Sequence, residues 1–314
     1  MCYNKKRMNR QGGYTIVETS LAIAVSAALV LMMAGIYSMS RTQQFSNAIS
    51  GAKAFIQSEY NDVHDGINAR IGGKQGRFSC EPDSYQYGGV SISAGYAAGN
   101  SQCYIMGRLI QFRNDRIQVS YVVVRPVGNT ATDETKRWPF QNKSAVENIK
   151  EASNRNWIYA LDSNGLINVD AGARSFERHY GSGVKLRGAW QAGLNGAKEL
   201  VRFGDNAGVG NFVVIHSPLG SSVLSYSNVS VSEIAGSAER QIKLNDSPKD
   251  INRNKFMVLY LNNAADGGSI NSNNASICLP LDGNSADISS RSPAPFDPKN
   301  VNVKALMQSC GERE

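Results

Sequence analysis

The carboxylate of Glu18 is the first group in this sequence whose type and position require a chemical explanation. It is the only charged residue in the apolar run from Tyr14 to Met39. Placing a carboxylate at the centre of a membrane costs about 2.5–3.5 kcal/mol, and somewhat less near the interface. Glu18 is therefore either tolerated among the lipid headgroups or paired with a cation that another chain supplies.

Four cysteines follow the apolar run and could form disulfide bonds: Cys80, Cys103, Cys278 and Cys310. They form no C-x-x-C pair and show no metal-ligand spacing with histidine. Four cysteines allow three connectivities. Because each pair is local and flanks an irregular stretch, we favour Cys80–Cys103 and Cys278–Cys310 over the alternative of four buried thiols.

The histidines do not indicate catalysis. His64, His179 and His216 lie far apart in the sequence, which contains no G-x-S-x-G, H-E-x-x-H or P-loop motif. We therefore expect a protein that is not an enzyme and that uses no metal or other cofactor.

A basic run between Arg240 and Lys255 is the one sequence feature that DNA uptake or phosphate binding would require. No motif identifies a host or surface ligand. Solvated loop charge explains the run more simply. The formal net charge of +7 falls to about +3 without the basic leader of residues 1–13, so the overall charge is a weak argument for nucleic acid.

The apolar run is long enough to cross a membrane, because about 20 helical residues span the hydrocarbon core. It exceeds the apolar region of a cleavable secretory signal, which has about 7–15 residues. We expect a membrane-retained helix over 14–39. Basic residues before the run keep the N-terminus in the cytoplasm and place the bulk of the chain outside the cytoplasmic membrane; they are Lys5, Lys6, Arg7 and Arg10.

Beyond the run, apolar residues recur at steps of three and four, which predicts an amphipathic helix over 40–71 that Gly72 and Gly73 end. The alternative is a membrane anchor followed by a separate helix. An apolar stripe on this helix needs a sheet to cover it. The stripe comprises Phe45, Ile49, Ala52, Ile56, Tyr60, Val63, Ile67 and Ile71.

The remainder, 72–314, is predicted to be β-rich. Residues 103–112 and 116–124 flank Asn114 and Asp115, which is typical of a β-hairpin with a tight turn. Ser144 and Glu147 form a capping box that predicts a helix over 144–152. A second lobe over 156–279 and an irregular, disulfide-bounded region over 278–310 complete the expected outer domain. Further strands are predicted at 157–161, 166–169, 184–186, 212–215, 223–226 and 256–261.

These elements predict an α+β fold, with a long N-terminal transmembrane and amphipathic helix packed on an antiparallel β-sheet headgroup. Of the 314 residues, 41% are apolar and 19% charged, which excludes an intrinsically disordered chain.

The junction around Gly13 and Tyr14 resembles the class III signal of type IV pilins and pseudopilins. A short basic leader ends in Gly13, the aromatic Tyr14 follows, and Glu18 stands at the fifth position after the glycine. The resemblance implies that prepilin peptidase cleaves after Gly13 and that the new N-terminal Tyr14 is N-methylated. It departs from the family in one residue, because the usual first residue there is phenylalanine.

By the same resemblance, Glu18 would pair with the N-terminal amine of a neighbouring subunit during assembly. The function implied is that of a large minor pilin. Such a chain would reside in the lipid bilayer, meet the pilus assembly platform and other pilin subunits, and end in an extracellular pilus. A pseudopilin of a secretion or competence system shares these features. A membrane-anchored surface adhesin or hydrolase is the alternative from a different class.

Overall fold

The computed structural model describes residues 15–65, 86–87, 90–91, 104–124, 145–161, 177–181, 183–193, 196–202, 209–216, 223–233, 239–245, 256–263, 273–281, 287–294 and 302–310. The chain divides into two compact units, Met1–Gln44 and Phe45–Glu314. The helix α1, Ile16–His64, begins in the first unit and ends in the second. The predicted stripe residues Ile67 and Ile71 lie outside the described part of the chain.

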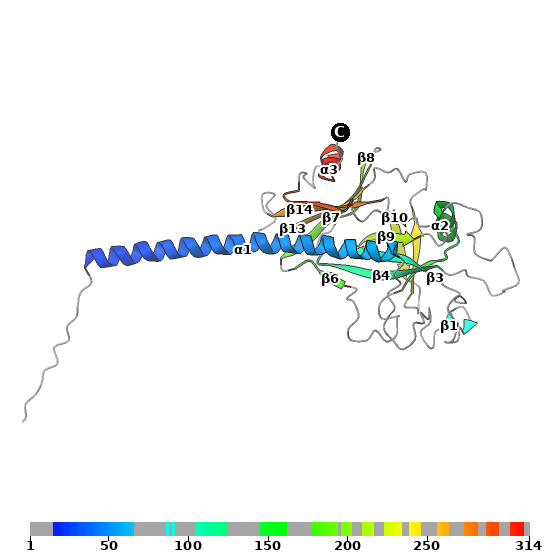
Figure 1. Cartoon of the computed structure of the whole chain (residues 1–314), viewed down its shortest axis with the longest axis horizontal. Helices are drawn as coiled ribbons and strands as arrows, with labels where there is room; N and C mark the ends of the chain where they lie inside the picture. The colour runs from blue at the N-terminus through cyan, green and yellow to red at the C-terminus, as the bar shows by residue number, and fades with distance from the viewer. Residues whose placement is uncertain are drawn as a thin grey trace, which may run out of the picture. The chain divides into compact units, whose positions relative to one another are not determined.

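The second unit is built on antiparallel sheets, so the molecule is an α+β protein with a β-rich domain (Figure 1). Strand β6 (Glu177–His179) pairs with β4 beside the path of the larger sheet. A separate two-stranded pair consists of β1 (Gln86–Tyr87) and β2 (Val90–Ser91). The larger sheet has the order β10 (Val223–Tyr226), β9 (Gly210–His216), β3 (Tyr104–Phe112), β4 (Arg116–Val124), β5 (Ile158–Leu161), β12 (Glu239–Leu244), β11 (Val229–Glu233). A five-stranded sheet has the order β15 (Ser289–Arg291), β14 (Asn274–Pro280), β13 (Phe256–Asn263), β7 (Val184–Gly193), β8 (Gly196–Arg202).

The apolar face of the C-terminal half of α1 packs into the main hydrophobic core, which also contains residues of both large sheets. Its apolar residues meet side chains such as Ile110 and Ile117 from one sheet and Leu259 and Ile277 from the other. The hydroxyl of Tyr60 donates a hydrogen bond of 3.1 Å to the carbonyl of Pro280. The predicted stripe is confirmed over its described length, because Phe45, Ile49, Ala52, Ile56, Tyr60 and Val63 are all buried.

Two smaller cores complete the second unit. The larger sheet curls so that Asn211 of β9 donates to the carbonyl of Val229 in β11, at 3.1 Å. Its other face packs against the helix α2 (Ala145–Asn154) through Ile149 and Ala152. The helix α3 (Val303–Ser309) covers the second face of the five-stranded sheet, where Leu306 joins the cluster that contains Trp190.

The predicted hairpin is confirmed: β3 and β4 pair with Phe112 opposite Ile117, and Asn114 and Asp115 form the turn. Strands also lie at the positions predicted from 157, 184, 212, 223 and 256 onward. The strand predicted at 166–169 lies outside the described residues. The strands of 156–279 are divided between both large sheets, and the eight-stranded one also contains β3 and β4. The segment predicted to be irregular after Pro280 contains β15 and α3.

Candidate membrane and assembly segment

The first turn of α1 is closed by a reciprocal capping box between Thr15 and Glu18. The Oε2 atom of Glu18 accepts hydrogen bonds from the backbone N–H of Thr15 at 2.9 Å and from its hydroxyl at 3.1 Å. The N–H of Glu18 donates to the Thr15 hydroxyl oxygen at 3.3 Å. A glutamate at the third helical position satisfies donors that a helix start otherwise leaves free, and its charge complements the positive end of the helix dipole.

Glu18 therefore has a hydrogen-bonding partner, Thr15, inside its own chain. Within the described residues only its Oε2 atom accepts these hydrogen bonds, so Oε1 remains available to a second donor. The capping role of Thr15 was not predicted, although the spacing Thr-x-x-Glu before an apolar run is a recognisable helix-start signal.

Three further hydroxyl groups in the segment, those of Thr19, Ser20 and Ser26, are satisfied by the helix itself. Thr19 donates to the carbonyl of Ile16 at 2.9 Å, Ser20 to Val17 at 2.9 Å and Ser26 to Ala22 at 2.7 Å. A hydrocarbon environment offers no hydrogen bonds, so polar groups must find partners in the protein. These hydroxyls meet that requirement, so they do not oppose insertion.

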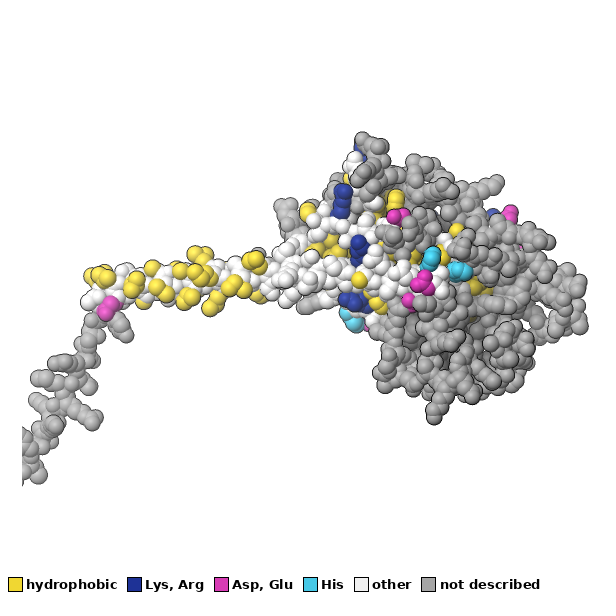
Figure 2. All heavy atoms as spheres, viewed as in Figure 1, with side chains coloured by type: hydrophobic (Ala, Val, Ile, Leu, Met, Phe, Trp, Pro, Cys, Tyr) yellow, Lys and Arg dark blue, Asp and Glu magenta, His cyan; other side chains and the backbone are white. Residues whose placement is uncertain are grey.

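The apolar side chains of the segment are exposed, as Figure 2 shows along the first part of α1. Ile16 is 88% exposed and Met39 76% exposed. Among the described residues, α1 is the one helix long and apolar enough to cross a membrane. Such an exposed apolar surface indicates contact with lipid or with another protein.

An aromatic and a cationic residue mark the far end of the segment. The guanidinium of Arg41 lies 4.3 Å from the ring centroid of Tyr37 and also donates to its hydroxyl. Tyrosine and arginine are typical of membrane–water interfaces. From Ile16 to Tyr37 the helix rises about 33 Å, which matches a hydrocarbon core of roughly 30 Å.

A buried charge cluster joins the second half of α1 to the sheet. The guanidinium of Arg108 lies 3.3 Å from the carboxylate of Glu59, and these side chains are 3% and 2% exposed. Asp62 lies 3.9 Å away, and the ring centroid of Tyr121 lies 3.9 Å below the guanidinium. Removing one partner of such a cluster leaves an uncompensated buried charge. The cluster therefore holds α1 against β3. Because Arg108 and Glu59 are buried, a substrate cannot reach them.

Two of the three histidines lie at the surface beside carboxylates. His64 and His179 are exposed and face the carboxylates of Asp65 and Glu177, respectively. Within the described ranges, no group of three or more His, Cys, Asp or Glu residues could hold a metal ion. Burial raises the pKa of the Tyr180 phenol far above its usual range, and the charge of Asp115 raises it further. This tyrosine therefore stays protonated at neutral pH.

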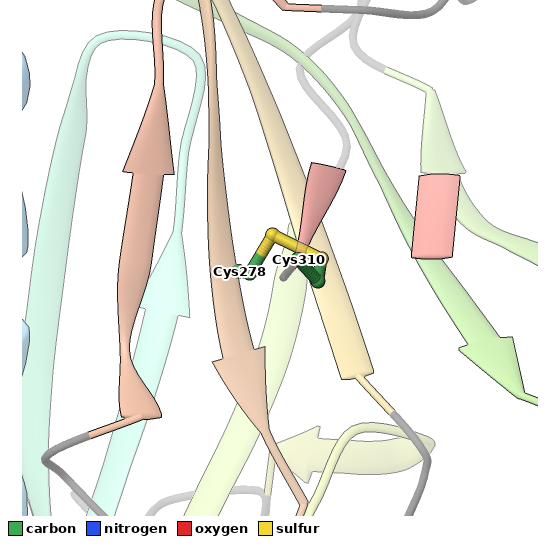
Figure 3. The surroundings of a disulfide bond; sticks show 2 residues. All are labelled: Cys278 and Cys310. Atoms are coloured by element: carbon green, nitrogen blue, oxygen red, sulfur yellow. A yellow bond between two sulfur atoms is a disulfide. The ribbon is translucent and has the colours of Figure 1, made fainter. Parts of the chain in front are cut away.

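Of the predicted disulfides, Cys278–Cys310 is present, with a Cα–Cα distance of 5.3 Å (Figure 3). It joins β14 to the residue that follows α3, on the side of the sheet where Trp190 and Leu306 pack. Cys80 and Cys103 lie outside the described residues, as do Gly13 and Tyr14.

Removing this disulfide is expected to lower the free energy of unfolding by about 2–4 kcal/mol, because it opens a long loop. The variant Cys278→Ala/Cys310→Ala tests it without the reductant that would also act on Cys80 and Cys103. Urea unfolding, followed by tryptophan fluorescence, should show a lower midpoint for the variant. An unchanged midpoint would show that apolar packing alone holds α3.

No family model, no curated protein and no solved structure matches this chain. The structure itself shows the class of protein. It is an α+β protein with a β-rich domain and, among the described residues, one N-terminal helix long and apolar enough to span a membrane.

Proposed function

We propose that this chain is a structural subunit of a type IV pilus-like filament, with the size expected of a large minor pilin. The proposal is supported by two features that occur in one helix, α1. The first is a start at which Thr15 caps Glu18, followed by exposed apolar side chains. The second is a C-terminal half that a β-rich domain buries.

In this proposal the chain first sits in the cytoplasmic membrane with its N-terminus in the cytoplasm. Prepilin peptidase removes residues 1–13 and Tyr14 becomes the methylated N-terminus. The assembly platform then transfers the subunit from lipid to the other pilin subunits of an extracellular filament. The exposed apolar surface of α1 suits both surroundings, because lipid tails and neighbouring apolar helices both exclude water.

The proposal also gives Glu18 two partners. Thr15 of its own chain binds Oε2, and the amine of a neighbouring subunit would bind Oε1. An opposite charge within about 4–6 Å favours the ionised carboxylate. The proposed role is structural, so no residue of the chain is assigned to catalysis, and no cofactor is required.

The test is the chemistry of the mature N-terminus. Mass spectrometry should find a chain that begins with N-methylated Tyr14. Gly13→Val should leave the precursor almost entirely uncut in the membrane, because a β-branched side chain at the scissile bond obstructs the peptidase. Gly12→Val serves as the matched control and should be cut far better. A mature N-terminus beyond residue 30 would instead identify a secretory signal and refute the proposal.

A further inference from the structure

The tip of the β3–β4 hairpin places two arginines directly opposite each other. Arg113 and Arg116 flank the turn, and the N–H of Arg113 donates to the carbonyl of Arg116 at 2.8 Å. Like charges directly opposite each other on an antiparallel pair are destabilising. A hairpin end that retains both arginines therefore suits an anionic partner.

The carboxylates nearby are shared among several donors. Glu177 on β6 lies 3.2 Å from the guanidinium of Arg116, but the same oxygen lies 3.2 Å from His179, and its other oxygen accepts from Gln118 at 3.1 Å. Asp115 lies 3.9 Å from the second ring nitrogen of His179. One carboxylate thus serves several donors.

Arg113 is the least satisfied of these groups. Its guanidinium forms no ion pair or hydrogen bond with any residue in the described ranges, and its Nε atom is buried without a partner. The Nε atom of Arg116 is buried without a partner as well. Guanidinium groups bind phosphate through paired N–H donors, and two of them can share one phosphate group.

This hairpin end lies where the chain enters the β-rich unit. The turn is bonded to the segment after β6, because the backbone N–H of Tyr180 donates to the carbonyl of Asp115 at 3.1 Å. The next residue, Gly181, lies against the side chain of Ala48 on α1. Ala48 follows Met39, the end of the apolar run, by nine residues, which span at most about 32 Å even when fully extended.

We propose that the hairpin tip, defined by Arg113 and Arg116 with His179 beside them, binds the phosphate groups of anionic lipids in the bilayer that α1 spans. The inference rests on the membrane step of the proposed function. Anionic lipid surfaces attract basic residues near the end of a membrane-spanning helix, and salt weakens this attraction. The contact would hold the β-rich unit on the membrane before the subunit is extracted.

Arginine footprinting of the full chain tests the proposal. The chain is placed in nanodiscs of phosphatidylcholine, either alone or mixed with phosphatidylglycerol, and treated with phenylglyoxal. Modification of Arg113 and Arg116 should slow by about fivefold in the anionic discs, the factor for one arginine at an anionic surface. High salt should remove the difference. Arg202, which is exposed and paired with Glu199, is the internal control and should react equally in both discs.

Equal rates for Arg113 and Arg116 in both discs would overturn the inference. Protection by inorganic phosphate in phosphatidylcholine discs, at the same phosphorus concentration, would identify a free-anion site and overturn the lipid assignment. A chain that does not co-elute with the discs would refute membrane anchoring itself, so the two failures are distinguishable.

A variant provides the second measurement. Anionic discs should raise the thermal midpoint of the wild-type chain, because a ligand that binds only the folded state stabilises it. Arg113→Gln/Arg116→Gln should lose this gain, while Arg202→Gln should keep it. A double variant that keeps the full gain would contradict the proposal.

Discussion

Replacing Ile56 by aspartate is expected to unfold the β-rich unit. Ile56 is fully buried in the core between α1 and the two large sheets. Losing its burial costs about 1.5–3 kcal/mol. A carboxylate without a partner in that position adds several kcal/mol more. The sum is comparable with the roughly 5–15 kcal/mol by which domains are stable.

The matched control is Ala54→Asp, which introduces the same charge on the exposed face of the same helix. It should cost below about 1 kcal/mol, mainly through helix propensity. Urea unfolding of the full chain in detergent micelles, followed by near-ultraviolet circular dichroism, compares the two variants. Similar midpoints for both would contradict the burial of this stripe.

Replacing Glu18 is expected to reduce entry into filaments by about tenfold or more, a factor that corresponds to about 1.4 kcal/mol of lost attraction. Insertion and leader cleavage should be normal, because neither needs the carboxylate charge. The readout is the ratio of processed subunit in sheared filaments to processed subunit in the membrane. Ser20→Ala, which removes only a hydroxyl bonded to Val17, is the control and should leave the ratio unchanged.

Two variants separate the local role of Glu18 from its role between subunits. Glutamine can still accept the hydrogen bond from Thr15, since capping boxes use either residue. Glu18→Gln therefore keeps the helix start and removes the charge, whereas Glu18→Ala removes both. If charge pairing drives assembly, both variants enter filaments poorly. If glutamine behaves like wild type, the capping box suffices and the pairing mechanism is wrong.

The parts of the fold that were predicted have strong local signals. The period of three and four residues from Phe45 to Val63 follows from helix geometry alone, and burial follows it residue by residue. The hairpin at 104–124 combines β-branched runs with a tight polar turn. The pairing Cys278–Cys310 was favoured because the two residues bound one local segment.

The elements that were missed have weak local signals. Strand β12 reads Glu-Arg-Gln-Ile-Lys-Leu, in which Ile242 is fully buried although the polar Gln241 and Lys243 stand on either side. Strand β14 is buried along its whole length although it contains Asn274 and Ser276. The seven-residue helix α3 is too short to be stable alone, and it gains its stability from Leu306 against the sheet and from the disulfide.

Arg240 shows how tertiary contacts change the meaning of a charge. The sequence places it at the start of a basic run that solvated loop charge explains. In the structure it lies on β12, is half-buried, and donates to Gln111 and, at 2.9 Å, to the hydroxyl of Ser120. It therefore links β12 to β3 and β4. Lys243, also on β12, is exposed, and residues 246–255 of the run lie outside the described residues.

By itself the sequence determined the long helix and the place where its environment changes, because both depend on the period of apolar residues along a continuous segment. It also determined the antiparallel hairpin at 104–124, because two adjacent β-branched runs flank a tight turn. Only the tertiary structure decided which strands share a sheet, that α1 packs into a core shared by two sheets, and that Arg108 meets a carboxylate 49 positions earlier in the chain. These features depend on contacts between distant segments. The energy of such a contact depends on both partners and on the water that they exclude, so it cannot be predicted from the sequence of either segment alone.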